Sequence, residues 1–310
     1  TGQPIDANQV LCFPGTQTAL FAVLMGVAEH GDEVLVGDPM YATYEGVIRG
    51  TGAEMVPVPL RPENDFRISA ADIADRITDK STAILLTTPH NPTGAVLTVK
   101  DIAEIGALAI KHDLWIIADE VYSELIFDGT AFASPLANAD IADRSIAVAS
   151  ISKSHAAPGF RSGWCIGPSA FIEALLPVSE TMLFGNQPFI ADMTEKAVRE
   201  GSEVAAGMRQ RYGARALRLA DRLAGHNALT VQNPQAGMFA LINVAGTGLN
   251  GDDYAHHLLE HGGVAVMPGS SFGSGLQSWI RVALTVDDDQ FDTAIDRILT
   301  HAASLQKVPA

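Results

Sequence analysis

The chain alternates between short apolar runs rich in β-branched residues and longer stretches in which apolar residues recur at helical spacing. The short runs are typical of buried strands, and the longer pattern is typical of amphipathic helices. Such alternation predicts an α/β fold with a mostly parallel central sheet covered by helices on both faces. The predicted strands lie near residues 10–13, 33–36, 54–58, 83–88, 114–118, 145–149 and 163–166, and the predicted helices near 17–29, 40–50, 69–77 and 100–111.

The pattern changes in the last third of the chain. From about Phe189 to Gly225 it is helical, and the residues that follow mix strand-like and helical segments. The length of the chain suits one large domain and one smaller one. We therefore predict a large domain over residues 1–220 and a small C-terminal α+β domain over residues 221–310.

Two local patterns add detail to the predicted helices. Ser69-x-x-Asp72 and Thr98-x-x-Asp101 resemble capping boxes, in which side chains bond the first free N–H groups of a helix. Basic side chains recur at helical spacing further along the chain, and such a stripe predicts a solvated or subunit-facing helix surface. The stripe consists of Arg211, Arg215, Arg218 and Arg222.

The residues after the strand predicted at 145–149 carry the first chemical signal. Lys153 follows that strand, at the kind of position where ligands collect in open α/β sheets. A lysine shielded from water and close to other cations becomes an amine nucleophile that can bond an aldehyde. Arg161 is a second cation, suited to a phosphate. Pyridoxal phosphate requires both groups, although an isolated lysine is more often an exposed surface residue.

A carboxylate follows the strand predicted at 114–118. Asp119 can pair with a pyridinium nitrogen and keep it protonated, which is the electronic adjustment that a pyridoxal-phosphate protein must supply. Tyr122, three residues on, can donate a hydrogen bond to the phenolic oxygen of the ring. Taken alone, Asp-Glu after a strand is more often a helix N-cap. The interpretation of Asp119 as a cofactor ligand therefore depends on the other motifs in the sequence.

Three loops supply weaker signals of the same kind. Asn91 can hydrogen-bond the same phenolic oxygen, although its Asn-Pro-x-Gly sequence is also that of an ordinary turn. Gly15 precedes a predicted helix, whose first free N–H groups form either an anion site or a plain helix cap. Tyr41 follows a proline turn and either offers an aromatic face to the ring or packs against the core.

As a group, these residues resemble the class I and II aminotransferases, which are fold type I pyridoxal-phosphate enzymes of the aspartate aminotransferase superfamily. The matching motifs occur in the family's order and at similar spacings over nearly the whole chain, and the ordered set is far more specific than any single motif. They are Gly15-Thr16-Gln17, Pro39-x-Tyr41, His90-Asn91-Pro92-Thr93-Gly94, Asp119-Glu120-Val121-Tyr122, Ser150-x-Ser152-Lys153, Arg161-x-Gly163-Trp164 and Trp279-Ile280-Arg281.

The resemblance implies a role for each of these residues. Lys153 would bond the cofactor and move the substrate proton, with Asp119 and Tyr122 completing the catalytic set. Arg281 would bind the substrate α-carboxylate, and Asn91 would contact both cofactor and substrate. No metal site is implied. The implied cofactor-binding set is Gly15, Thr16, Gln17, Tyr41, Asn91, Asp119, Tyr122, Ser150, Ser152, Lys153 and Arg161.

Composition argues against several other classes of protein. The formal net charge of −16 argues against nucleic-acid binding, since a phosphate-binding surface needs a basic stripe. Cys12 and Cys165 both lie in strand-like runs and give neither a disulfide framework nor a metal-ligand spacing. No apolar run approaches the length of a membrane span, so we expect no membrane partner.

By resemblance, the reaction is the transfer of an amino group from an amino acid to a 2-oxo acid by a ping-pong mechanism. No second arginine can be placed in the pocket for a side-chain carboxylate, so dicarboxylic substrates are not favoured. Residues 113–129 are similar to arginine–pyruvate transaminases, which suggests a basic amino acid with pyruvate. Two alternatives stay open: a pyridoxal-phosphate C–S β-lyase, and the aminotransferase-like sensor domain of a transcription regulator.

The start of the sequence departs from the family pattern. Family members carry a segment before the phosphate-binding turn, which here comes at residue 15. We therefore expect a cut, processed or partial polypeptide, in which the family's N-terminal arm, part of its small domain and a tyrosine lent to the partner's phosphate site cannot be assigned. The resemblance also implies a homodimer with active sites near the subunit interface, and a cytoplasmic location.

Overall fold

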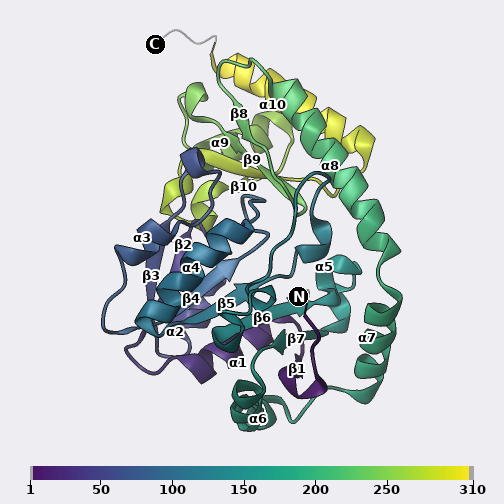
Figure 1. The fold of residues 1–310 in the computed structure, drawn as a ribbon. Coiled ribbons are helices and arrows are strands. Elements are labelled where there is room, and N and C mark those ends of the chain that lie inside the picture. The colour runs from purple at the N-terminus through teal and green to yellow at the C-terminus, as the bar shows by residue number, and fades with distance from the viewer. Residues whose placement is uncertain (1–2, 307–310) are drawn as a thin grey trace.

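A computed structural model describes residues 3–306 of the chain. Its larger part is built on a seven-stranded sheet with the strand order β1-β7-β6-β5-β4-β2-β3 (Figure 1). β2 to β6 pair in parallel, and β7 pairs antiparallel with β1 and β6. The predicted mostly parallel sheet is therefore confirmed. The strands are β1 (Val10–Phe13), β2 (Glu33–Asp38), β3 (Glu54–Pro59), β4 (Ser81–Thr87), β5 (Trp115–Asp119), β6 (Ser145–Ser150) and β7 (Gly163–Ile166).

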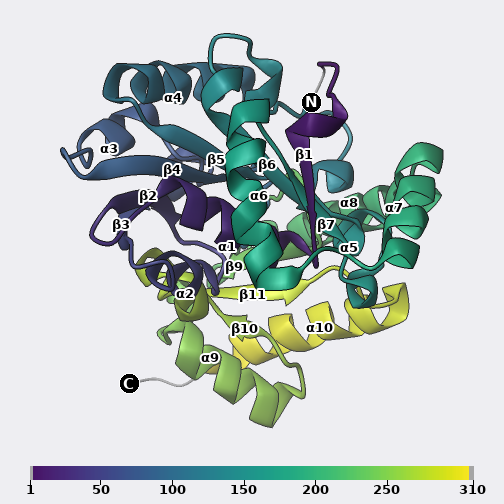
Figure 2. The same ribbon diagram turned by 90° about the horizontal axis from the view of Figure 1, so that it is seen from below.

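Helices cover both faces of this sheet, as the alternating pattern predicts (Figure 2). The two faces have separate cores: Val34 of β2 packs in one, and its neighbour Leu35 packs in the other. The helices of the first face are α1 (Thr16–Val27), α2 (Tyr44–Arg49) and α6 (Ser169–Leu183), and those of the second are α3 (Ala70–Ala74) and α4 (Val99–His112). Two further helices, α5 (Ile151–Ser154) and α7 (Pro188–Glu200), lie beyond β6 and α6 in the sequence.

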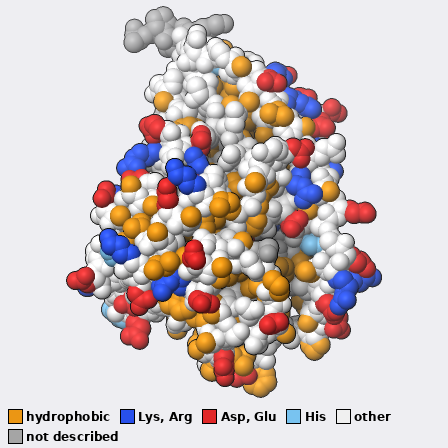
Figure 3. Space-filling view, viewed as in Figure 1, with side chains coloured by type: hydrophobic (Ala, Val, Ile, Leu, Met, Phe, Trp, Pro, Cys, Tyr) orange, Lys and Arg blue, Asp and Glu red, His pale blue; other side chains and the backbone are white. Residues whose placement is uncertain are grey.

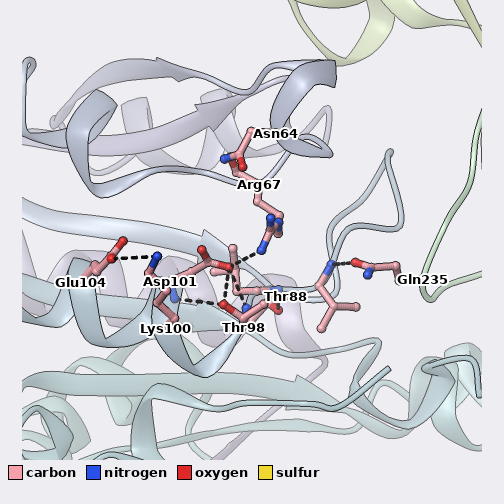
Figure 4. Close-up of polar contacts among 10 residues, drawn as sticks. Asn64, Arg67, Thr88, Thr98, Lys100, Asp101, Glu104 and Gln235 are labelled. Carbon is pink, nitrogen blue, oxygen red and sulfur yellow. Dashed lines mark hydrogen bonds and ion pairs between the residues drawn. The ribbon is translucent and has the colours of Figure 1, made fainter. Parts of the chain in front are cut away.

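The capping box predicted at the start of α4 is present (Figure 4). The Thr98 hydroxyl accepts a hydrogen bond from the Asp101 N–H at 3.1 Å, and the Asp101 carboxylate accepts one from the Thr98 N–H at 2.8 Å. Arg67 also donates to Asp101, at 3.0 Å. Ser69 likewise caps α3 by accepting a hydrogen bond from the Asp72 N–H. These contacts satisfy N–H groups that a helix start leaves free.

The smaller part of the molecule is a four-stranded antiparallel sheet with the order β10-β11-β9-β8. It shares one apolar core with three helices, α8, α9 and α10. The domain boundary predicted at residue 220 lies inside α8, and the division into two domains stays a prediction. The elements are α8 (Glu203–Leu223), β8 (Thr230–Gln232), β9 (Phe239–Asn243), α9 (Gly251–His257), β10 (Met267–Pro268), β11 (Trp279–Ala283) and α10 (Asp288–Leu305).

Three of the four arginines of the stripe on α8 pair with acidic residues of α10. The prediction of a solvated or subunit-facing surface is wrong for the buried Arg215, whereas Arg211 and Arg222 are exposed. The Arg215 side chain is only 6% exposed and donates to the Asp288 carboxylate at 2.8 Å. Further along the two helices, Arg218 pairs with Asp292 at 2.9 Å, and Arg222 pairs with Asp296. Helical spacing identifies which side chains share a face, but the partner of that face comes from the tertiary fold.

The surface visible in Figure 3 mixes acidic and basic side chains and carries no continuous basic stripe on that face. Such interspersed charge gives no electrostatic footprint for a nucleic acid there. Within residues 3–306, no helix combines the length and the apolar character needed to cross a membrane.

Candidate active site

The predicted site residues gather at the carboxyl ends of the parallel strands, beside the small sheet. Asp119 ends β5 and Ser150 ends β6, and ligands of open α/β sheets bind at such ends. The cavity there has a volume of about 550 Å³, and Arg281 of β11 contributes to its wall. The predicted residues that line it are Thr16, Gln17, Tyr41, Asn91, Asp119, Tyr122, Ser150, Ser152, Lys153, Arg161 and Arg281.

Asp119 is a buried carboxylate held by two donors. The Tyr44 hydroxyl donates to its Oδ2 at 2.7 Å, and the Val121 N–H donates to its Oδ1 at 3.1 Å. Burial raises the pKa of Asp119, while these hydrogen bonds and the charge of Lys153 act in the opposite direction. A cation facing this carboxylate from the cavity would stabilise its charged form further.

Lys153 lies in the single turn α5, directly after β6. Ser150 caps this turn by accepting a hydrogen bond from the Ser152 N–H at 3.4 Å. Burial lowers the pKa of Lys153, nearby guanidinium groups lower it further, and Asp119 opposes that shift. The amine therefore holds its proton less tightly than an exposed lysine does, which makes it a better nucleophile and base.

Gly15, Thr16 and Arg161 form a cationic corner of the site. Gly15 has a φ of 94° and precedes α1, whose first N–H groups lack partners within the helix. The Thr16 hydroxyl oxygen is buried without a hydrogen-bond partner among the described residues. The Arg161 guanidinium lies where a Cβ on Gly15 would be, and donates to the carbonyls of Pro14 at 3.1 Å and Pro158 at 2.8 Å. Gly15 does not itself line the cavity. Its contribution is the space that its missing side chain leaves for the Arg161 guanidinium.

Arg281 of the small sheet contacts Asn91, which lies in the loop after β4 of the large sheet. The Arg281 Nη1 donates to the Asn91 Oδ1 at 3.0 Å, and the Asn91 side chain lies near enough to Tyr122 to oppose the rise in the pKa of that phenol. The guanidinium carbon lies 4.4 Å from the centroid of the Phe272 ring and 5.2 Å from that of the Phe239 ring. Asn91 therefore connects the predicted substrate-binding arginine to the predicted cofactor-binding tyrosine.

Tyr41 and Gln17 are less buried than the residues around Asp119. Tyr41 is 38% exposed, and its ring makes an edge contact with the Tyr44 ring at a centroid distance of 5.7 Å. The Gln17 Oε1 accepts a hydrogen bond from the Thr43 hydroxyl at 3.1 Å. Tyr41 is thus a partly exposed aromatic residue of the cavity lining.

The structure adds cavity residues that the sequence patterns did not indicate. Tyr44 is completely buried, accepts a hydrogen bond from the Thr87 hydroxyl at 3.0 Å and donates one to Asp119. Met238 and Met267 contribute apolar wall. The only available signal for Tyr44 was its place three residues after Tyr41, which is equally typical of core packing. Within residues 3–306, no cluster of His, Cys, Asp and Glu is arranged to hold a metal ion.

Comparison with known proteins identifies the family. The model of the family "Aminotransferase class I and II" matches residues 2–298. The chain is 40% identical to the arginine–pyruvate transaminase of Pseudomonas aeruginosa over 98% of this chain and 77% of that protein. It is 30% identical to aromatic-amino-acid aminotransferase 2 of Thermococcus litoralis over 95% of this chain and 77% of that protein.

Solved structures agree with the sequence comparison. The aromatic aminotransferase of Pyrococcus horikoshii OT3 has a TM-score of 0.91 at 28% identity and covers 97% of this chain and 81% of its own. The N-succinyldiaminopimelate aminotransferase of Mycobacterium tuberculosis has a TM-score of 0.89 at 29% identity. That match covers 97% of this chain and 79% of the other. The chain therefore belongs to the class I and II aminotransferases, enzymes that use pyridoxal phosphate and have the fold type I architecture. The resemblance drawn from the sequence motifs is confirmed.

Proposed function

We propose that the chain binds pyridoxal 5′-phosphate in the cavity at the strand ends and transfers the amino group of an amino acid to a 2-oxo acid. The observation that carries the proposal is the convergence of Lys153, Asp119, Arg161 and Arg281 on one cavity of about 550 Å³. These groups suit an aldehyde, a ring nitrogen, a phosphate and a carboxylate respectively. Membership of the aminotransferase family supports the same reading.

The cationic corner suits the phosphate. The unpartnered hydroxyl of Thr16, the free N–H groups at the start of α1 and the Arg161 guanidinium all offer donors to an anion. Ser150 and Ser152 add hydroxyl groups to the same lining, and Gln17 completes the predicted set. A buried hydroxyl without a partner is costly, and a bound phosphate would satisfy it.

The remaining donors and rings suit a pyridine ring. Asp119 would hold the ring nitrogen in its protonated form, and Tyr41 would cover one face of the ring. Tyr122 and Asn91, which both line the cavity, would share the phenolic oxygen. When bound, the cofactor supplies an electron-accepting ring conjugated to an aldehyde.

Lys153 has two tasks in the proposed reaction. With its lowered pKa, its amine would be unprotonated more often than that of an exposed lysine and so would be available as a nucleophile to a bound aldehyde. The same amine would then be placed to hold and move the proton of the substrate Cα. General-base catalysis of this kind is typically worth about 10²–10⁴-fold. Arg281 meanwhile orients the α-carboxylate with two parallel hydrogen bonds, a geometry that lysine cannot reproduce.

The rest of the lining bears on the substrate side chain. Met238, Val266, Met267 and Ala283 are apolar, and the described cations of the lining already have roles in the proposal. This argues against dicarboxylic donors and favours an apolar side chain or a long aliphatic stem. The similarity to an arginine–pyruvate transaminase makes arginine with pyruvate the first pair to test, and we propose a basic amino acid as donor.

Lys153→Ala tests the mechanism. The variant should lose the absorbance of the bound cofactor's covalent link to lysine and lose turnover by about 10³-fold or more, because it removes both the nucleophile and the base. Lys111→Ala, on the exposed side of α4, is a matched control that should retain both. Transamination by Lys153→Ala at the wild-type rate would refute the mechanism.

A donor panel tests the substrate. Steady-state rates should be highest for arginine or lysine when pyruvate is the acceptor, and lower with 2-oxoglutarate. Equal rates across all donors would remove the proposal of a basic substrate while leaving transamination intact. Release of ammonia and pyruvate from cystathionine without any acceptor would instead identify a C–S β-lyase.

We also infer a cytoplasmic homodimer whose active sites lie near the subunit interface, without nucleic-acid or membrane partners. Large apolar side chains are exposed around the junction of α6 and α7, where Phe184 is 97% and Phe189 is 65% exposed. Exposed apolar patches on soluble proteins commonly mark interfaces. Light scattering on the purified protein should give twice the mass of the chain, and a monomer at micromolar concentration would contradict the inference.

A further inference from the structure

Arg281 is held by aromatic rings as well as by its hydrogen bond to Asn91. Its guanidinium carbon lies 4.4 Å from the Phe272 centroid and 5.2 Å from the Phe239 centroid. Both rings are 4% exposed, so water is largely excluded from these cation–π contacts, which strengthens them. Phe239 lines the cavity, whereas Phe272 is not among its lining residues. Phe272 therefore acts on the cavity through Arg281.

Phe272 is fixed in turn by the loop that follows β2. Its carbonyl accepts a hydrogen bond from the Met40 N–H at 2.7 Å, and the Ser274 hydroxyl donates to the Asp38 Oδ2 at 2.7 Å. Gly273 lies between these contacts with a φ of 148°, and a Cβ there would overlap the Asp38 carboxylate. The turn over residues 272–274 is thus fitted closely against the loop over residues 38–40, one residue before Tyr41.

The orientation of the guanidinium matters for its proposed task. Bidentate binding of a carboxylate requires the plane of the arginine fork to match the plane of the ligand. An arginine side chain has many rotamers, and the loss of rotamer entropy opposes any single one of them. Rings packed against Arg281 fix that plane before the substrate arrives, which lowers the cost of ordering on binding.

We propose that Phe272 is a positioning residue for substrate binding. With Phe239 it fixes the plane of the Arg281 guanidinium, and the contacts of residues 272–274 tie that plane to the loop that carries Tyr41. The inference rests on the proposed role of Arg281 as the α-carboxylate ligand. Substrate affinity should therefore depend on Phe272, whereas the proton transfer by Lys153 should not.

The test compares Phe272→Leu and Phe272→Tyr with Phe291→Leu in the holoenzyme. Phe291 is 3% exposed in the core around α10, so its variant is a matched loss of a buried ring. The readouts are KM and kcat for the best amino donor and the Kd of 4-methylpentanoate, a carboxylate without an amino group, measured by calorimetry. Urea unfolding confirms that each variant is folded.

Phe272→Leu should raise both KM and Kd by about three- to thirtyfold, the range expected for loss of one shielded cation–π contact. Its kcat should stay within about twofold of wild type, because a loss confined to binding changes KM alone. Phe272→Tyr keeps the ring and should restore wild-type KM and Kd. Phe291→Leu should lower stability without changing either constant.

Unchanged KM and Kd in Phe272→Leu would overturn the inference, as would a fall in kcat at constant KM. If Phe272→Leu does not fold, Ser274→Ala replaces it. Loss of the hydrogen bond to Asp38 should raise the Kd by about two- to fivefold, and an unchanged Kd would count against the inference.

Arg281→Gln separates this inference from the proposed function. A loss of carboxylate affinity in Arg281→Gln, combined with wild-type affinity in Phe272→Leu, would leave the proposed function intact and remove only the role of Phe272. Wild-type carboxylate affinity in Arg281→Gln would remove the proposed role of Arg281 and the positioning role with it.

Discussion

The hydroxyl of Tyr44 donates to the carboxylate that faces the proposed ring nitrogen, and Tyr44→Phe removes that donor together with the acceptor of the Thr87 hydroxyl. The loss should raise the pKa of Asp119 further, because the Tyr44 hydrogen bond is one of the effects that lower it. A carboxylate with a higher pKa would stabilise a protonated ring nitrogen less, so kcat should fall by about tenfold, the usual scale for one hydrogen bond to a charged group.

Steady-state kinetics with saturating cofactor checks this prediction, and Tyr254→Phe is its control. Tyr254 is also completely buried, but its hydroxyl donates to the Ile298 carbonyl at 3.4 Å within the core of the small sheet. Equal losses of kcat in the two variants would mean that Tyr44 contributes to stability alone.

At the scale of single residues, sequence reasoning identified groups whose chemistry is rare at strand ends. Lys153 and Asp119 stood out because each is charged and follows an apolar run, and Arg161 because it is a second cation eight residues after Lys153; all three line the cavity. Tyr44 and Phe272 could not be identified in this way. Their roles depend on what they touch in the fold, and a buried aromatic residue has the same sequence pattern whether it packs or positions.

At the scale of elements, the pairing of α8 with α10 predicts unequal effects along the arginine stripe. Arg215→Met should lower the free energy of unfolding by about 2 kcal/mol, because the buried carbonyl of Leu284 loses the donor that contacts it at 2.8 Å. Arg222→Met removes an exposed ion pair with Asp296 and should have a smaller effect that high salt suppresses. Urea unfolding at low and high salt distinguishes the two, and equal effects would argue against a buried anchor at Arg215.

The strands and the long helices of the large sheet could be predicted because their periodicity is set locally. The helix expected over residues 100–111 occurs as α4, and its capping box forms between Thr98 and Asp101. The helices expected over residues 40–50 and 69–77 are shorter than predicted, as α2 and α3. Their ends are set by loops that turn toward the cavity and the sheet edge, and hydrophobic periodicity carries no signal for such turns.

At the scale of the whole molecule, the protonation of two buried groups should have opposite effects on the free energy of unfolding as the pH changes. Burial lowers the pKa of His90 to about 4 from an ordinary 6.5, and raises the pKa of Glu120 to about 7 from an ordinary 4.5. As the pH falls from 6.5, an unfolded chain protonates His90 while the folded chain does not, so stability is lost. Over the same window the folded chain protonates Glu120 before the unfolded chain does, so stability is gained.

The two effects should cancel in the wild-type protein, so only the single variants should show a change of unfolding free energy with pH from these groups. Between pH 6.5 and pH 4.5, the free energy of unfolding of His90→Gln should rise relative to wild type by about 2 kcal/mol, and that of Glu120→Gln should fall by a similar amount. Urea unfolding at a fixed cofactor concentration measures both, and the double variant should follow the wild-type slope. Curves for the single variants that run parallel to wild type would mean that neither group changes its protonation on unfolding. Because His90 precedes Asn91 and Glu120 follows Asp119, such a balance would hold the loops of the candidate site at constant stability over the acidic range.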